Sequence, residues 1–425
     1  MLSSVFLSWP NVYGLDLTRA QVVQYALANS EIIRVQEMVE KESALTIVAA
    51  RSSLLPQVDV MANYDQNWML PSFVFNGASV TIGSENDMRT AVGLRQALFS
   101  GGRNSASKNV AEYSHLGSKS QGQSIRQSVV AQAEHAFYDV LVAIELASVS
   151  YLALKNARES LDLIKTRRAV GRGSTFEELR ARGHVSSMAA DSIAAVNNIV
   201  LTQLNLKSII GLDLETAINV KGDLSRQSLW ENIGIDSLIF VALKMRPDLK
   251  AMKHQLRAQE QKIRLEKSAR WPVVDFVMSG QAQMQSDRLV DENAKWRKSW
   301  STGLTLRIPV FDGFLTRSRI GQARAQSEAV RLQLSNLHRK IKLEIKMNVR
   351  RIDEAVARVN AEKQVLIEAE KAIQMSRSRY STGAGTQLEI LDAQLLLVRT
   401  QTNLALARRD RAIGFLELDR SLGLL

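Results

Sequence analysis

The spacing of hydrophobic positions changes along the chain, and the same order of changes occurs in each half. Residues 16–55 and 236–270 have the period of amphipathic helices, and each segment begins beside Asp, Ser or Thr residues that can cap the first free amides. Each segment stops at a proline, Pro56 or Pro272, and alternation of apolar and polar residues begins directly after it. The pattern therefore predicts a helix followed by a strand in both halves.

The alternating segments predict strands with one apolar and one polar face. After Pro56, Val58, Val60 and Tyr64 fall on one face, and Asp59 falls on the other. Strands of about 10 residues are long enough to cross a bilayer at a tilt. We expect one β-hairpin in each half, over about residues 57–99 and 272–311, with loops at about 69–88 and 287–298.

Long helices follow the predicted hairpins. Residues 103–170 and 314–381 contain no proline, and each would extend roughly 100 Å if fully helical. A glycine-containing break then precedes a partner helix in each half, which gives two helical hairpins. The partner helices cover about 174–210 and 386–424, and the hairpin tips carry Gly171, Gly173, Gly383 and Gly385.

The two halves are also related in sequence. Residues 94–101 align with 306–313, and the same offset of 212 residues pairs Gly171 with Gly383. Two tandem repeats of this size fill the chain. We divide it into an N-terminal segment over 1–15, which could be a signal-peptide remnant, a first repeat over 16–210, a connecting strap over 211–235 and a second repeat over 236–425.

Composition limits the chemistry. The 425 residues include no cysteine, which excludes disulfides, thiolate metal sites and a Cys nucleophile. The five histidines lack metal-ligand spacing, and no nucleophile elbow, phosphate-binding loop or metalloprotease motif occurs. We therefore expect no cofactor, no metal site and no enzymatic activity. No run of 18 apolar residues is free of charge, so we also expect no membrane-spanning helix.

The net charge and the positions of the tryptophans give weaker indications of function. The formal net charge is +12, but the basic residues are spread along the helices among acidic residues and without interleaved aromatics. This distribution favours solvated helix faces over a nucleic-acid surface. Around the predicted hairpins, tryptophans are placed as in an interfacial belt, although ordinary packing explains any one of them. They are Trp68, Trp271, Trp296 and Trp300.

The junctions and hairpin tips resemble those of the TolC-like outer-membrane efflux proteins. Leu55-Pro56 and Trp271-Pro272 end helices before strands, and Phe99-Ser100-Gly101-Gly102-Arg103 has an echo in Phe311-Asp312-Gly313. Near the second tip, Arg379-Tyr380-Ser381-Thr382-Gly383 precedes Leu388-Glu389-Ile390-Leu391-Asp392-Ala393-Gln394. The resemblance covers essentially the whole chain, in both repeats and in order. The helix–strand junction residues on which it depends are Pro56, Gly101, Pro272 and Gly313.

The resemblance implies a mainly α fold with a membrane β-barrel part. A long α-helical periplasmic barrel would continue into a barrel to which each protomer of a homotrimer gives four strands, twelve in all. It also implies the outer membrane of a Gram-negative bacterium, contact with its lipid, and two partners: a periplasmic adaptor (membrane fusion protein) and an inner-membrane ABC or proton-driven transporter. The strand count independently requires association, because four strands cannot close a barrel and lipid does not tolerate an open edge.

The resemblance further assigns roles at the entrance of the tunnel. Glu389 and Asp392 match acidic positions that form carboxylate rings, Glu177 matches the equivalent place in the first repeat, and Tyr380 matches a gate-locking tyrosine. Gly385 stands where an arginine can lock the closed state, so we expect a less tightly latched entrance. Carboxylates in a narrow neck repel one another and attract cations. Alternatively, Glu389 and Asp392 are ordinary solvated acids near a helix N-terminus.

Two classes of function remain. The first is a passive exit duct of a tripartite export system, in which Gly171-Arg172-Gly173-Ser174 and the missing cysteine resemble type I protein secretion more than lipoprotein drug efflux. Multidrug or solute efflux is the alternative within this class. The second class is a soluble coiled-coil scaffold or periplasmic adaptor, which explains the long helices but not one alternating segment per repeat.

Overall fold

The computed structural model describes residues 14–75, 77–226, 230, 233–288 and 294–425. Most of the predicted N-terminal segment, residues 1–13, lies outside the described residues, and Leu15 belongs to a strand. The chain forms two compact units, and each unit contains parts of both repeats. Unit one comprises residues up to 37 with 121–249 and 336–425, and unit two comprises residues 38–120 and 250–335.

Eight helices and eight strands are present in the described residues. The helices are α1 (Arg19–Asn29), α2 (Glu31–Ser52), α3 (Arg103–Ala169), α4 (Thr175–Ile210), α5 (Ile235–Met245), α6 (Pro247–Ser268), α7 (Leu315–Thr382) and α8 (Gln387–Leu422). The strands are β1 (Leu15–Leu17), β2 (Gln57–Gln66), β3 (Ser72–Phe75), β4 (Ala78–Thr81), β5 (Asn86–Phe99), β6 (Ile218–Val220), β7 (Val273–Ser286) and β8 (Arg297–Arg307).

The helix that opens each repeat is divided in two, which corrects the single helices expected over 16–55 and 236–270. The backbone is extended at Ser30, between α1 and α2, and at Arg246, between α5 and α6. The second break has a local cause, because Pro247 has no amide hydrogen and disfavours helical geometry at the residue before it. The strap is likewise more than a connection, since its strand β6 pairs in parallel with β1.

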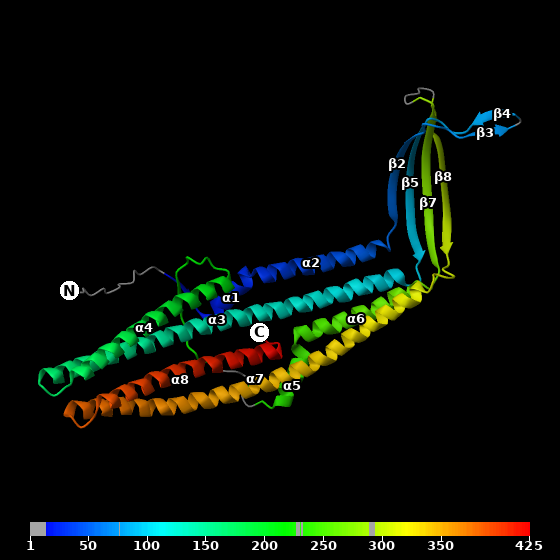
Figure 1. Cartoon of the computed structure of the whole chain (residues 1–425). Helices are drawn as coiled ribbons and strands as arrows, with labels where there is room; N and C mark the ends of the chain where they lie inside the picture. The colour runs from blue at the N-terminus through cyan, green and yellow to red at the C-terminus, as the bar shows by residue number, and fades with distance from the viewer. Residues whose placement is uncertain (1–13, 76, 227–229, 231–232, 289–293) are drawn as a thin grey trace. The chain divides into compact units, whose positions relative to one another are not determined.

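Unit two contains a four-stranded antiparallel sheet in the order β2-β5-β7-β8 (Figure 1). The hairpin of the first repeat therefore lies beside the hairpin of the second, with β5 paired to β7. Strand β8 ends at Arg307, earlier than the strand expected to reach Phe311, because Pro309 cannot donate to a ladder. Within the described residues, β2 and β8 each pair on one side only.

The register gives this sheet one polar and one apolar face. Asp59 lies opposite Gly93, and Gly93 lies opposite Ser279, so the polar positions of three strands share a face. Arg95 on this face donates to Asp275 at 2.5 Å. The opposite face carries apolar residues of all four strands, many of them exposed in the single chain: Val58, Val60, Val92, Met278, Trp300, Leu304 and Leu306.

A second hairpin interrupts the first, where the sequence analysis expected only a loop. Strands β3 and β4 pair with each other, with Phe75 opposite Ala78, and form a sheet of their own. In the sequence, the dipeptide Asn76-Gly77 between two apolar runs is the signal for such a tight turn. The loop between the predicted long strands is therefore partly a short sheet.

The predicted junction residue Gly101 packs in unit two against another junction. Its φ of +61° is in the left-handed region, and a Cβ atom would lie 2.4 Å from Cβ of Trp271 and 3.0 Å from the carbonyl oxygen of Ser268. Gly313 has a similar φ of +63°, but nothing lies within 4 Å of its Cβ position. The positive φ favours glycine at both positions, but only at Gly101 do neighbouring atoms also leave no room for a side chain.

We therefore expect Gly101→Ala to be more damaging than the matched variant Gly313→Ala. Both introduce left-handed backbone strain of about 1–2 kcal/mol, and Gly101→Ala adds an overpacking cost of about 1–3 kcal/mol. The amount of folded protein recovered from membranes after expression of each variant measures the difference. Equal recovery of the two variants would show that the contact with Trp271 relaxes without cost.

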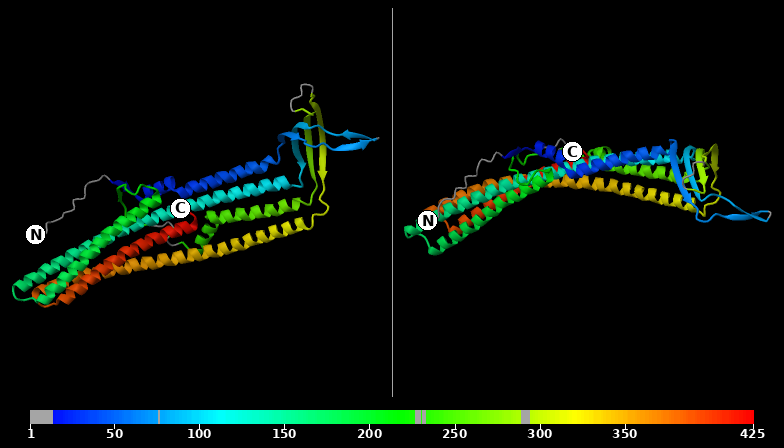
Figure 2. Two further views of the ribbon diagram at one scale, coloured as in Figure 1. Left: turned by 45° about the horizontal axis from the view of Figure 1, so that its top comes forward. Right: turned by 90° about the horizontal axis from the view of Figure 1, so that it is seen from above.

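Unit one is built around two helical hairpins, α3–α4 and α7–α8, whose loops are visible in both views of Figure 2. One buried cluster joins residues of α1, α3, α4, α8 and the strands β1 and β6, including Phe137, Tyr138, Leu206 and Ala412. A second cluster joins α3, α4, α7 and α8 near the loops, including Ile164, Ala181, Tyr380 and Ile390. Packing between the hairpins therefore holds the two repeats together in this unit.

Two helices have an apolar composition that the sequence analysis underestimated. Windows of 18 residues in α3 and α4 reach mean hydropathies of 1.6 and 1.2, enough by length and composition to cross a membrane. This differs from the expectation that no segment is apolar enough, but core helices of soluble proteins meet the same criterion. Half of the window in α3 is buried, as in a core helix, whereas only 17% of the window in α4 is buried in the single chain.

Charged residues form pairs deep in unit one. Arg226 of the strap donates to Glu134 of α3 and, at 2.7 Å, to Asp419 of α8. The side chains of Arg226 and Glu134 are only 8% and 6% exposed. A burial this complete is tolerated only because each charge has a partner. The strap is thus fixed to two helices by one arginine.

A second pair makes the stability of unit one depend on pH. Glu417 lies 2.7 Å from Nε2 of His135 and accepts from Arg420 at 2.8 Å. The hydrogen bond with His135, followed by that from Arg420, lowers the pKa of Glu417 from 4.5 to about 2. Since the folded pKa lies below the unfolded value, this stabilisation is complete above pH 4.5 and is lost as the pH falls toward 2.

We expect the unfolding temperature of the wild type to fall more steeply below pH 4.5 than that of Glu417→Gln, which lacks the titrating group. Circular dichroism of the helices at a series of pH values measures this. Glu354→Gln removes an exposed carboxylate paired with Arg358 and serves as the control, with a profile like that of the wild type. Parallel profiles for the wild type and Glu417→Gln would contradict the assignment.

Candidate functional site

The candidate site lies at the tips of the two helical hairpins of unit one. Each long helix ends at a glycine in the left-handed region, Gly171 with φ of +74° or Gly383 with φ of +85°. The partner helix then begins with a capping box. Ser174 accepts from the backbone while Glu177 accepts from the amide of Ser174, and Thr386 pairs with Glu389 in the same way.

The second glycine of each tip packs closely on its own helix. A Cβ atom on Gly173 would lie 3.0 Å from the amide nitrogen of Arg168. On Gly385 it would lie 2.9 Å from Cβ of Arg379 and 3.0 Å from Oε2 of Glu389. A larger residue at 385 therefore has to displace the pair formed by Arg379 and Glu389, which gives a local reason for glycine at this position.

The two tips contact each other through Arg167 and Gln387. The guanidinium of Arg167 lies 4.4 Å from the centroid of the Tyr380 ring, and its Nη1 donates to the carbonyl oxygen of Tyr380 at 2.5 Å. From the other side, Nε2 of Gln387 donates to the carbonyl oxygen of Glu177 at 2.8 Å. One charged and one neutral contact thus join the first hairpin to the second.

Tyr380 is the centre of this arrangement. Its side chain is 2% exposed, and its hydroxyl makes no well-aligned hydrogen bond within the described residues. Burial raises the pKa of Tyr380, and the nearby negative charge of Glu177 raises it further. The phenol therefore stays neutral, and its ring and backbone carbonyl, rather than an ionised oxygen, are the groups held by Arg167.

The acidic candidates have different surroundings. Glu389 accepts from Nε of Arg379 at 3.2 Å, while the same arginine donates to the carbonyl oxygen of Ala384. Asp392 is exposed and forms no ion pair within the described part of the chain. The buried acid of the first tip is Glu178, which pairs with two arginines, and not Glu177. Within the described residues, Asp392 and Glu177 are thus the acids of these tips that have no ion-pair partner, and Glu177 is engaged as a helix cap.

The structure therefore brings Glu177, Tyr380 and Glu389 together at the tips and places Asp392 one turn further along α8. Sequence reasoning missed the basic residues and the amide that hold these groups. A signal was present, because Arg167 and Arg379 occupy equivalent positions of the two repeats. The residues it did not identify are Arg167, Glu178, Arg379 and Gln387.

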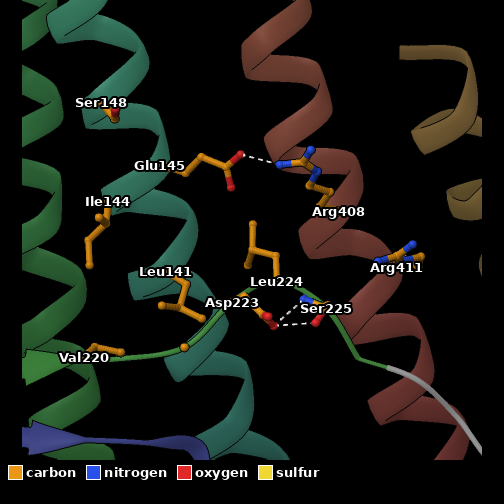
Figure 3. Close-up of a pocket in the computed structure, with 11 residues that line it drawn as sticks. Leu141, Ile144, Glu145, Ser148, Val220, Asp223, Leu224, Ser225, Arg408 and Arg411 are labelled. Atoms are coloured by element: carbon orange, nitrogen blue, oxygen red, sulfur yellow. Dashed lines mark hydrogen bonds and ion pairs between the residues drawn. The ribbon is translucent and has the colours of Figure 1, made fainter. Parts of the chain in front are cut away.

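A separate pocket of about 530 Å³ lies between α3, α8 and the strap (Figure 3). Arg408 donates to Glu145 at 3.1 Å, and Asp223 accepts from the amide and hydroxyl of Ser225, whereas Nε of Arg411 has no hydrogen-bond partner among the described residues. The lining residues include no histidine or lysine that could act as a general base toward the Ser225 hydroxyl. Among the residues that the structure describes, no group of three His, Cys, Asp or Glu side chains could hold a metal ion.

Comparison with known proteins agrees with this architecture. The family model for outer membrane efflux proteins matches residues 22–212 and 238–424. The chain is 25% identical to outer membrane protein TolC of Escherichia coli over 95% of its own length and 82% of the relative. It is 24% identical to the pyoverdine export outer membrane protein OpmQ of Pseudomonas aeruginosa over 92% of its length and 83% of that protein.

Solved structures share the fold. The outer membrane protein VceC of Vibrio cholerae superposes with a TM-score of 0.81 at 18% identity, covering 95% of this chain and 96% of VceC. Such proteins are outer-membrane channels that extend into the periplasm, form homotrimers and work with periplasmic adaptors and inner-membrane transporters. They are not enzymes, and a soluble scaffold does not agree with this match. Because the family model covers most of both repeats, the chain belongs to the outer membrane efflux protein family.

Proposed function

We propose that this chain forms the passive outer-membrane duct of a type I protein secretion system, in which the inner-membrane transporter supplies the energy. The observation that carries the duct is the two-faced sheet of unit two, with polar residues on one side, apolar residues on the other and a free edge at β2 and at β8. A sheet of this kind suits a wall between lipid and water.

Closure of this wall follows from the strand directions. The four strands alternate in direction, so β8 of one copy runs antiparallel to β2 of the next and can pair with it. Three copies then form a closed barrel with no free edge in lipid. Contact between copies also accounts for the exposed apolar window of α4, which a neighbouring copy would cover.

We assign the gate of the duct to the hairpin tips. In this assignment Arg167 fastens the second hairpin to the first through Tyr380, and Asp392 supplies the carboxylate ring at the entrance. Glu389 contributes less negative charge to the ring, because Arg379 pairs with it, and Glu177 acts mainly as a helix cap. The latch that Gly385 cannot provide is supplied by Arg167.

Protein cargo is supported by the first tip, whose Gly171-Arg172-Gly173-Ser174 resembles the secretion branch. Small-molecule efflux is the second candidate, because relatives include a pyoverdine export protein and a solvent efflux pump protein of Pseudomonas putida. Deletion of the gene distinguishes the two. Loss of a large protein from the culture medium with unchanged drug sensitivity supports secretion, whereas unchanged secreted proteins with raised sensitivity to dyes and solvents supports efflux and overturns our assignment.

A further inference from the structure

The segment between β2 and β5 has an unusual composition. Residues 66–84 contain no charged residue, although 23% of the whole chain is charged. Within this segment Trp68 and Met69 are 87% and 91% exposed, and Phe73 and Phe75 are more than half exposed. Large apolar side chains this exposed indicate a surface that something covers.

The short hairpin β3–β4 separates its side chains by face. Phe73 and Phe75 share one face with Ala78, while Ser72, Ser79 and Thr81 share the other with Val74. The aromatic groups therefore gather on one side and the hydroxyl groups on the other. A two-stranded sheet by itself is only marginally stable in water, so contact of its apolar face with another surface would stabilise it.

The connections of the hairpin place it at the outer end of the sheet. Helix α2 leads into the start of β2 and helix α3 follows the end of β5, so the opposite ends of these strands carry β3 and β4 (Figure 1). Because the helices of this family extend into the periplasm, these opposite ends face the cell exterior. Backbone hydrogen bonds join the two chain segments that lead into the hairpin. The backbone amide of Asn67 donates to the carbonyl oxygen of Glu85 at 2.7 Å, and that of Ile82 donates to the carbonyl oxygen of Pro71 at 3.0 Å.

We infer that the aromatic face of this hairpin, with Trp68, lies in the outer leaflet of the outer membrane and anchors each protomer to the lipid around the channel. The sheet from which the hairpin emerges already has an apolar face of the kind that contacts lipid, so the hairpin leaves a part of the chain that our proposed function places against the membrane. The absence of charge over residues 66–84 leaves no charged side chain in this segment that the acyl chains of the leaflet would exclude. Tryptophan is enriched at the same depth.

The free edges of the hairpin limit how deep it lies. Strands β3 and β4 pair only with each other among the described residues, so each leaves backbone groups unpaired on its outer side. Unpaired backbone groups are not tolerated in the hydrocarbon core. The hairpin is therefore shallow, with Phe73 and Phe75 among the head groups and upper acyl chains and the hydroxyl face toward water.

The absence of cysteine allows a direct test. Single-cysteine variants Phe75→Cys and Ser79→Cys, on opposite faces of one hairpin, are labelled with an environment-sensitive fluorophore in the full-length protein. The labelled trimers are reconstituted in phospholipid vesicles carrying a nitroxide either near the head group or near the end of the acyl chain. Val60→Cys, on the apolar face of β2, is the lipid-facing control, and all variants must retain the trimer band in a gel run without heating.

We expect head-group nitroxides to quench the label at Phe75→Cys at least about twofold more than the label at Ser79→Cys. At Phe75→Cys, head-group nitroxides should also quench more than chain-end nitroxides, because the hairpin is shallow. Equal quenching on both faces would overturn the anchor. So would absent quenching at Phe75→Cys under conditions in which the Val60→Cys label is quenched, because the aromatic face would then lie outside the lipid.

Discussion

Replacing Arg167 by alanine is expected to open the entrance of the tunnel. The change removes a cation over the Tyr380 ring and a hydrogen bond to its carbonyl oxygen, which are contacts between the two hairpins of one protomer. For a partly exposed arginine these contacts are worth about 2–3 kcal/mol together, a shift of roughly 30- to 160-fold toward the open state. The wild type should stay mostly closed without its partners.

Single-channel conductance in planar bilayers measures this shift directly. Arg172→Ala is the matched control, because this arginine belongs to the same tip and its side chain is exposed. Arg167→Lys should give an intermediate conductance, since it keeps the charge but loses the planar guanidinium. Cells expressing Arg167→Ala should also become sensitive to bulky antibiotics that the outer membrane normally excludes. Wild-type conductance in Arg167→Ala would show that this contact does not hold the gate.

Replacing Arg226 by methionine is expected to cause the largest loss of stability. The change leaves Glu134, which is 6% exposed, and Asp419, which is 16% exposed, without the cation that both contact. Removing one partner of a buried ion pair costs about 3–5 kcal/mol. Nη1 of Arg19 remains 4.0 Å from Glu134, beyond hydrogen-bond distance, so it offsets the loss only in part. The strap should then detach from α3 and α8, and the unfolding temperature of the helices should fall.

Lys221→Met is the control for this effect. Lys221 lies in the same strap and pairs with Asp16 at 2.6 Å, but both side chains are more than half exposed. Exposed pairs contribute about 0–1 kcal/mol, so this variant should unfold near the wild-type temperature. Adding Glu134→Gln and Asp419→Asn to Arg226→Met should restore part of the loss. Equal unfolding temperatures for Arg226→Met and Lys221→Met would contradict a buried network.

Local periodicity was sufficient for the regular elements of the fold. The change from helical spacing to alternation at Pro56 and Pro272 indicated the two hairpins, and long segments without proline indicated the long helices. Errors arose where one residue decides the outcome. Pro247 divides a helix, and Gly77, with φ of +79°, lies in the turn between β3 and β4, and both signals are local ones.

The sequence predicted the motif residues of the candidate site but not the residues that contact them. Tyr380, Glu389 and the tip glycines follow from the repeat and from the family resemblance, because they belong to short motifs with fixed spacing. The partner of Tyr380 does not, since Arg167 lies 213 residues away in sequence. Many exposed arginines of the long helices have the same local surroundings in sequence, so none of them is marked as the one that reaches the other hairpin.

The sequence by itself determined the repeat, the order of helices and strands, the two faces of the strands and the glycines at the tips. Neighbouring residues decide these features, because helical and strand periods and positive φ angles depend on positions only a few residues apart. Only the tertiary structure decided that β5 pairs with β7, that Arg226 serves Glu134 and Asp419, and that Arg167 holds Tyr380. Those choices depend on which surfaces pack together, and packing is settled by shape and burial across the whole unit.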